Sequence, residues 1–207
     1  MIETIYEDGA VVVCIKPDET VSEAAEGASN SLPNLLINEK GYKELFTVHR
    51  LDKDVSGLIV YAKTKAAAAE LSKQITEGIF AKEYIAAVEG KVNENETLTD
   101  LLYFDKSKNK SYVVKKERRG VKRAELKYTL ISYDAESDTS YVKIALITGR
   151  THQIRIQFAS RKHPVIGDKK YGSKHSVKPI KLYSAQLEFI SPITAKPLSF
   201  SSTPDWF

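Results

Sequence analysis

The sequence predicts an α+β fold with a mixed, largely antiparallel sheet flanked by helices and loops. Segments with strand character outnumber those with helical character, and the two kinds do not alternate regularly, as a parallel sheet would require. Hydrophobic residues make up 42% of the 207 residues, which is enough to form a substantial core. No low-complexity linker or internal repeat interrupts the sequence, so we expect a single domain over residues 1–207.

The first predicted elements are a buried strand and a short helix. Residues 10–15 form a continuous apolar run that ends at Lys16-Pro17, which is typical of a buried strand. Residues 32–40 favour a helix, and Gly41 is placed to end it.

A second strand and helix follow in the same order. Residues 57–62 are apolar and β-branched, which favours another buried strand. Thr64 can cap a helix that runs to about Thr76, because its first turns are rich in alanine. Gly78 is expected to close this helix.

The middle of the chain predicts strands. Residues 80–88 alternate, which would place Lys82 and Tyr84 on one face of a strand. Residues 126–133 and 141–147 have similar character, and the polar turn between them predicts a connection between two strands.

The segment from Thr151 onward fits either a strand or a helix. We favour a helix, because Thr151 is a suitable cap and Pro164 a suitable stop. Residues 182–189 predict the last strand. The tail that contains Pro192 and Pro197 is expected to be packed, irregular chain.

Charge is distributed unevenly along a chain whose formal net charge is +4. The first fifty residues contain nine Asp or Glu against four Lys or Arg. Residues 105–127 contain ten Lys or Arg against three acidic residues, and residues 161–181 contain seven against one. This asymmetry favours a polyanion bound on one face, although each basic run could also be a solvated loop.

Two distant segments concentrate polar chemistry. They read HRLDKDVSG at residues 49–57 and GRTHQIR at residues 149–155, and each adjoins apolar sequence. Ionisable groups set against a core cost desolvation energy unless they pair or act in catalysis. One carboxylate, Asp52, could therefore lie in a positive pocket built by His49, Arg50, Arg150 and Arg155, as a carboxylate nucleophile acting on an anionic substrate would require.

Several classes of protein are disfavoured. Cys14 is the only cysteine, so an intramolecular disulfide is impossible, and its apolar surroundings predict a buried thiol. A metal hydrolase could use His49 and Asp52, but the other candidate ligands lie among arginines, so we expect no metal site. Nucleotide-binding motifs, a signal peptide and a membrane span are missing from the sequence, so we expect a cytoplasmic protein.

The polar segments carry a family resemblance. HRLDKDVSGL at 49–58 resembles the catalytic motif of RluA-type pseudouridine synthases, which is generally His-Arg-Leu/Ile-Asp-x-x-Thr-Ser-Gly. KEYIAAVEG at 82–90 is similar to the family's second motif, and GRTHQIRIQF with HPVIGDKKYG resembles its third. Together with the strand that ends in Lys16-Pro17, these matches occur in the family's order and span nearly the whole chain.

The resemblance implies a single pseudouridine synthase catalytic domain that isomerises uridine in rRNA or tRNA without a cofactor. Asp52 resembles the essential aspartate, and Arg155 the arginine that pairs with it. Tyr84 resembles the tyrosine that stacks on the target base. Arg50 resembles the arginine that fills the gap left by the extracted nucleotide, since the glycosidic bond is inaccessible in a stacked helix.

The remaining expectations concern RNA contacts. Lys82, Arg150 and His152 are expected to contact phosphates or support the scaffold. The exposed cations of the first basic run are expected to bind structured RNA, namely Lys115, Lys116, Arg118 and Arg119. The chain starts almost directly with the catalytic domain, so we expect no added N-terminal RNA-binding module. We also expect no protein partner and a monomer.

Two positions depart from the family pattern. Val55 stands where the family most often has Thr, and Gln157 where His is common. The alternatives from other functional classes are a non-catalytic RNA-binding domain, which would not need a carboxylate facing a polyanion, and a metal-dependent phosphoesterase.

Overall fold

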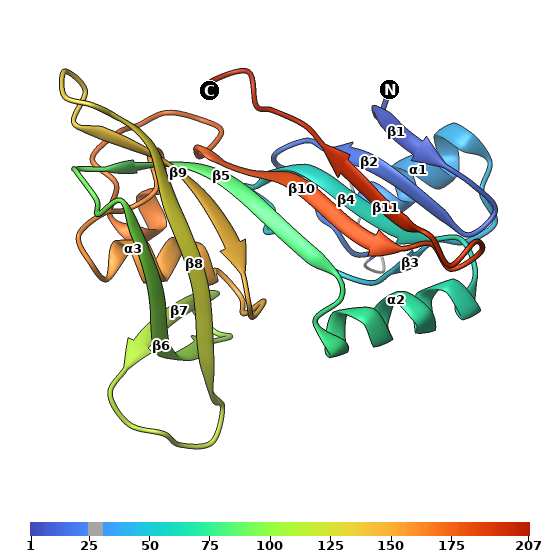
Figure 1. Ribbon diagram of the computed structural model, residues 1–207, viewed down its shortest axis with the longest axis horizontal. Coiled ribbons are helices and arrows are strands. Elements are labelled where there is room, and N and C mark those ends of the chain that lie inside the picture. The colour runs from blue at the N-terminus through green and yellow to red at the C-terminus, as the bar shows by residue number, and fades with distance from the viewer. Residues whose placement is uncertain (25–30) are drawn as a thin grey trace. The chain divides into compact units, whose positions relative to one another are not determined.

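The computed structural model describes residues 1–24 and 31–207 (Figure 1). It forms two compact units, one made of Met1–Lys82 with Tyr183–Phe207 and the other of Glu83–Leu182. Both units are built on sheets with few helices, which confirms the α+β class. That they act as one catalytic domain over residues 1–207 stays a prediction.

The first unit contains a mixed sheet. Its neighbouring strands are β1 (Thr4–Glu7), β2 (Val11–Lys16), β4 (Ser56–Ala62) and β10 (Leu182–Ile190), with β3 (Phe46–Thr47) paired to β4 and β11 (Pro197–Ser201) paired to β10. All of these pairings are antiparallel except that of β4 with β10, which is parallel. The predicted mixed, largely antiparallel sheet is therefore confirmed.

The predicted strands 10–15 and 57–62 are β2 and β4, and they form the buried centre of this sheet. Val12 and Ile59 point to one face, Val13 and Val60 to the other, and all four are inaccessible to solvent. Burial on both faces explains why each strand is a continuous apolar run and not an alternating one. Cys14, on β2, is buried as the sequence predicts.

Two helices, α1 (Leu32–Lys40) and α2 (Lys65–Glu77), belong to the first unit and confirm both predictions (Figure 1). The Thr64 hydroxyl caps α2 by accepting a hydrogen bond from a backbone N–H in its first turn. Gly78 ends this helix in the left-handed conformation. Leu71 packs into the core, and Gln74 bonds both backbone groups of Ile190, which ties α2 to β10.

The second unit contains an antiparallel sheet in the order β5, β9, β8, β6, β7. Its strands are β5 (Ala81–Glu89), β6 (Asn95–Asp105), β7 (Lys110–Val114), β8 (Val121–Asp134) and β9 (Thr139–Leu146). One face packs against α3 (Gln153–Ala159) and the short 3-10 helix η1 (Lys169–Tyr171), where Leu102 and Ala124 meet Ile156 and Tyr171. Tyr128 adds a ring contact with Phe158 at 5.2 Å.

Two details of the expected elements are wrong. The helix after residue 150 exists, but its N-cap is His152 and not Thr151, and His152 has a positive φ of 53° without a side-chain cap. Residues 182–189 are not the last strand, because β11 follows. Pro197 is the first residue of β11, a position where a strand tolerates the missing N–H, and Phe200 packs on Tyr6 and Phe189.

Candidate active site

Asp52 lies in the turn that leads into β4. The turn is closed by a hydrogen bond of 3.0 Å from the Val55 N–H to the Asp52 carbonyl oxygen. Leu51 and Val55 are buried on either side, while the Asp52 side chain is half-buried. Two apolar anchors thus hold a carboxylate at the boundary between the core and solvent.

Ser22 fixes the backbone before Asp52. Its hydroxyl donates to the Leu51 carbonyl oxygen at 2.8 Å and accepts from the Leu51 N–H at 3.1 Å. The Tyr61 hydroxyl, on β4, donates to the Ser22 carbonyl oxygen at 2.8 Å. Strand, serine and turn therefore form one connected hydrogen-bond network.

Lys16 fixes the backbone after Asp52, a role that the sequence reasoning missed. The side chain is inaccessible to solvent, and its ammonium donates to the carbonyl oxygens of Pro17, Thr20 and Lys53 at 2.8, 2.8 and 3.0 Å. Burial lowers the pKa of Lys16 to about 8, opposed by nearby carboxylates that include Asp52. The end of β2 is thereby joined to the Asp52 turn.

His49 is not one of the cations of a positive pocket, which corrects the sequence-based interpretation. The ring is buried, and its Nε2 accepts the Val60 N–H at 3.1 Å. Burial, reinforced by the charge of Lys82, lowers the pKa of His49 to about 3, so the ring is neutral. His49 instead packs at 5.4 Å from the Phe80 ring and anchors the start of the motif to β4.

The structure explains why the segment HRLDKDVSG ends in a glycine, Gly57. Its φ is +115°, and a Cβ at this position would clash with the backbone of Ser184 on β10. Only glycine allows β4 and β10 to pair here, directly after the Asp52 turn.

Arg50 and Lys82 have different environments in the first unit. Arg50 is exposed and pairs with Glu23 at 2.9 Å, where both side chains are about half accessible. Such a surface pair is easily exchanged for another anion. Lys82 lies 5.8 Å from the Phe80 ring centroid, and burial lowers its pKa.

Arg155, in the second unit, forms a buried two-pronged ion pair with Asp168. Nε donates to Oδ2 at 2.6 Å and Nη2 to Oδ1 at 2.9 Å, with accessibilities of 2% and 1%. The sequence reasoning missed this partner, although Asp168 is the only acidic residue among the seven cations of residues 161–181. The pairing of Arg155 with Asp52 stays a prediction.

Tyr84, Arg150 and His152 also belong to the second unit. Tyr84 is 5% exposed and lies on β5 opposite Ile144. Arg150 is exposed, and its Nε donates to the Arg123 carbonyl oxygen at 3.0 Å. The buried His152 ring lies with Nδ1 2.9 Å from the Tyr171 hydroxyl, and its role in phosphate contact or scaffold support stays a prediction.

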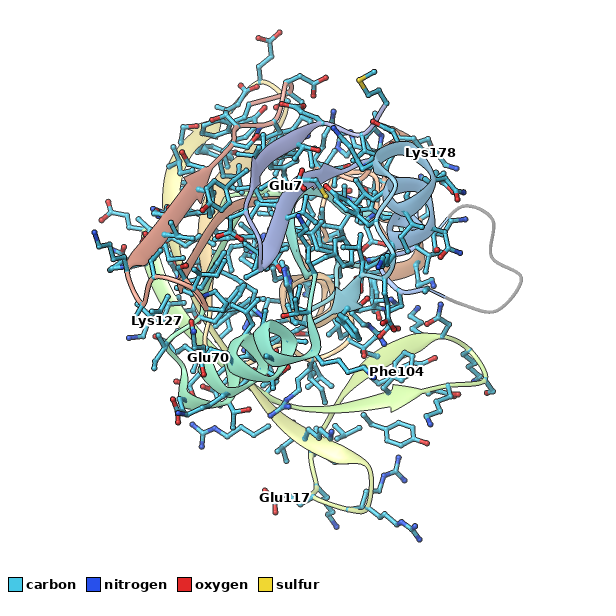
Figure 2. The ribbon with its side chains drawn as sticks, turned by 90° about the vertical axis from the view of Figure 1, so that its right-hand side faces the viewer. Glu7, Glu70, Phe104, Glu117, Lys127 and Lys178 are labelled. Atoms are coloured by element: carbon cyan, nitrogen blue, oxygen red, sulfur yellow. The ribbon has the colours of Figure 1, made fainter. Side chains whose placement is uncertain are left out.

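The basic run at residues 105–127 extends from the end of β6 through β7 and into β8, two strands that each pair with β6. Lys115, Lys116, Arg118 and Arg119 are all exposed in the connection between β7 and β8, where Figure 2 labels Glu117. Arg118 lies 4.9 Å above the Tyr103 ring centroid. The four cations therefore lie in an exposed connection between two strands, and their contacts with phosphate stay a prediction.

Both departures from the family pattern are buried. Val55 is 2% exposed beside Asp52. Gln157 is inaccessible, and its Nε2 donates to the Leu98 carbonyl oxygen at 3.2 Å and to the Asp100 carboxylate at 2.8 Å. Gln157 thus connects α3 to β6.

Two features are absent from residues 1–24 and 31–207, the part of the chain that the structure describes. These residues contain no group of three or more His, Cys, Asp or Glu side chains that could hold a metal ion. None of the helices in these ranges is long and apolar enough to cross a membrane.

Comparisons with known proteins identify relatives of this chain. The profile of the family described as RNA pseudouridylate synthase matches residues 10–160. The dual-specificity RNA pseudouridine synthase RluA of Yersinia pestis is 33% identical over 199 residues, which cover 95% of this chain and 96% of that protein. Its namesake in Escherichia coli strain K12 is 30% identical over 205 residues, which cover 98% and 93%.

Solved structures show the same fold. Human RNA pseudouridylate synthase domain containing 1 has a TM-score of 0.82 and 20% identity, and covers all of this chain with 85% of its own. Human RNA pseudouridylate synthase domain containing 4 has a TM-score of 0.79 and 22% identity, with 99% and 90% covered. With the family profile and the RluA relatives, these findings show that the chain belongs to the RNA pseudouridylate synthases, as an RluA-type isomerase of uridine in RNA.

Proposed function

We propose that this enzyme isomerises specific uridines in rRNA or tRNA with Asp52 as its essential carboxylate, acting as a monomer in the cytoplasm. The observation that carries the role of Asp52 is its turn, fixed on one side by Ser22 and on the other by Lys16. A catalytic group held by a rigid shell is already oriented for reaction. The term dual-specificity in the names of the RluA relatives supports more than one RNA substrate.

The reaction conserves the atoms of the uridine. The bond between C1′ of the ribose and N1 of the uracil breaks, the base turns, and C5 bonds to C1′. The hydrogen on C5 leaves as a proton and N1 gains one, so no oxidant or reductant is required. The carboxylate acts either as nucleophile or as base on the sugar.

Arg155 is proposed to hold this carboxylate in its ionised form. A guanidinium carries five N–H donors, and the pair with Asp168 orients it through Nε and Nη2. An opposite charge in contact lowers a carboxylate pKa and fixes its orientation. Asp168 would therefore act through Arg155 and not on the substrate.

Base recognition is assigned to two other residues. Tyr84 is proposed to stack on the extracted uracil, because an aromatic face supplies contact area at little entropic cost. Arg50 is proposed to fill the vacated stack. Its exposed pair with Glu23 supports this role, because a surface ion pair can be broken at low cost.

RNA binding is assigned to the cations that lie outside the fixed core. Lys115, Lys116, Arg118 and Arg119 are exposed, as is Arg150. Phosphate contacts release counterions, so affinity should fall steeply with salt. Lys82, on β5, is proposed to contribute to the same phosphate contacts.

The test uses RNA that carries tritium at C5 of uridine, because isomerisation releases this hydrogen to water. Asp52→Asn keeps the shape of the side chain but cannot form the anion, and it should abolish release while RNA affinity persists. Asp54→Asn is the matched control, since it neutralises the neighbouring carboxylate of the same turn. Substantial tritium release by Asp52→Asn, or equal loss in both variants, would contradict the assignment to Asp52.

A further inference from the structure

One hydroxyl in the second unit joins three separate segments. Tyr171 ends η1 and is 8% exposed. Its hydroxyl oxygen accepts the Ser111 N–H of β7 at 2.8 Å and lies 2.9 Å from Nδ1 of His152, the residue that precedes α3. A strand, a helix start and a 3-10 helix thus meet at a single buried polar atom.

A second contact strengthens the link between β7 and the start of α3. The Ser111 hydroxyl donates to the Thr151 carbonyl oxygen at 2.6 Å. His152 holds a positive φ of 53°, a conformation that few non-glycine residues adopt unless their surroundings enforce it. The contacts of Ser111 and Tyr171 with this segment provide such surroundings.

The same tyrosine contacts the site of Arg155. Its ring centroid lies 5.4 Å from the Arg155 guanidinium carbon, and its N–H donates to the Asp168 carbonyl oxygen at 3.1 Å. The Lys110 ammonium of β7 lies 5.2 Å from the same ring. Tyr171 therefore contacts the Arg155 guanidinium, the backbone of its ion-pair partner Asp168, and strand β7.

Tyr171 contacts the strand that leads into the exposed cations. We define the basic segment as β7 and residues 115–120, which include the four exposed cations proposed to bind RNA. β7 and β8 both pair with β6. Ser111 lies at the core-facing side of β7, paired across the strands with Phe104, which Figure 2 labels. A displacement of β7 would move Ser111 and so strain the hydrogen bonds that end at Tyr171 and Thr151.

We propose that Tyr171 is a positioning residue that couples the basic segment to the Arg155 guanidinium. RNA bound along the basic segment holds β7 in place. Through its contacts, β7 in turn positions the Tyr171 hydroxyl and the residues around His152, and these position Arg155 against Asp168. Substrate binding then orients the guanidinium that is proposed to hold the catalytic carboxylate. The inference rests on the proposed function, namely RNA contact by the basic segment and the pairing of Arg155 with Asp52.

Tyr171→Phe tests this coupling, because it keeps the ring beside Arg155 and Lys110 and removes only the hydroxyl. The measurements are the RNA dissociation constant and the single-turnover rate at saturating enzyme. We expect a rate that falls roughly 10- to 100-fold, as small misplacements of catalytic groups produce, with little change in affinity. Ser111→Ala removes only the hydrogen bond to Thr151. It should also slow the single-turnover rate with little change in affinity, but by a smaller factor.

Tyr128→Phe is the matched control. Tyr128 is also a buried tyrosine of the second unit, and its hydroxyl donates to Glu96 at 3.1 Å, away from the contacts of Tyr171. It should lose stability as Tyr171→Phe does, but keep the single-turnover rate. Equal rates in the two tyrosine variants would overturn the coupling and leave Tyr171 as an ordinary core residue.

A second experiment separates coupling from simple damage. The four exposed cations of the basic segment are replaced by alanine together, in the wild type and in Tyr171→Phe. In the wild type the replacement should weaken binding and also slow the saturated rate, whereas in Tyr171→Phe it should only weaken binding. Independent, multiplicative effects on the rate would overturn the coupling. A wild-type enzyme without turnover would overturn the proposed function as well, so the two failures are distinguishable.

Discussion

Replacing Lys16 by Met should change how the stability of the protein depends on pH. Lys16 is fully buried, and its ammonium is held by the carbonyl oxygens of Pro17, Thr20 and Lys53. Met has similar length and carries no titratable group. The difference in unfolding free energy between the two proteins therefore isolates the titration of Lys16, because the other titrating groups are common to both.

The magnitude follows from the pKa of Lys16, which burial lowers from 10.5 to about 8. Between these pH values the unfolded chain binds a proton that the native protein has lost, so raising the pH favours the native state. One pKa unit corresponds to about 1.4 kcal/mol. The stability of the wild type relative to Lys16→Met should therefore rise by about 3 kcal/mol between pH 7 and pH 10.5.

Urea unfolding of both proteins across this pH range measures the difference. Lys73→Met, on the exposed side of α2, is the control for effects that any replacement of lysine by methionine brings. A flat difference for Lys16→Met would refute the argument that burial disfavours the charged form of Lys16. A difference that fell with pH would show that the carbonyl cage stabilises the ammonium more than burial disfavours it.

Three further substitutions test the packing around the site. Asp168→Asn breaks the buried pair with Arg155 and should lower the unfolding free energy by roughly 3–5 kcal/mol in urea titrations, so a loss below about 1 kcal/mol would contradict the pair's buried character. Gly57→Ala places a Cβ against the Ser184 carbonyl and should cost roughly 4 kcal/mol or more, and a thermal midpoint equal to that of wild type would show that the close approach is absent. Thr64→Ala removes the cap of α2 and should cost about 1 kcal/mol by calorimetry, whereas a neutral result would mean that water replaces the cap.

Elements with strong local signals could be predicted from the sequence. The helix capped by Thr64 and closed by Gly78 has both of its termini encoded nearby. The buried strand at residues 10–15 has an apolar run that no exposed element would tolerate. Phe200 and its strand were missed because Pro197 suggested irregular chain, while the packing that stabilises β11 comes from residues distant in sequence.

The contacts of the candidate site residues could not be predicted from the sequence. Arg155 and Asp168 are separated by thirteen positions, and only the tertiary fold makes them partners. Lys16 ends β2, as the sequence predicts, but its burial and its three carbonyl partners are not predicted, because lysine is rarely buried. The sequence alone suggests that His49 is a cation. Its burial and its acceptance of a backbone N–H depend on the packing of β4, which the sequence does not reveal.

Chemical labelling of Cys14, the single thiol of the chain, can measure how often the first unit opens. Cys14 is inaccessible on β2, and burial raises its pKa to about 12, so the folded protein resists alkylation at this position. Labelling can proceed only from conformations in which the sheet around β2 has opened, and its rate then reports the free energy of that opening. Because residues 83–182 contain no cysteine, amide exchange in that unit can be compared with thiol labelling in the other. Matching free energies would mean that both units unfold in one cooperative event, and a lower value for the thiol would mean that the unit carrying Asp52 opens alone.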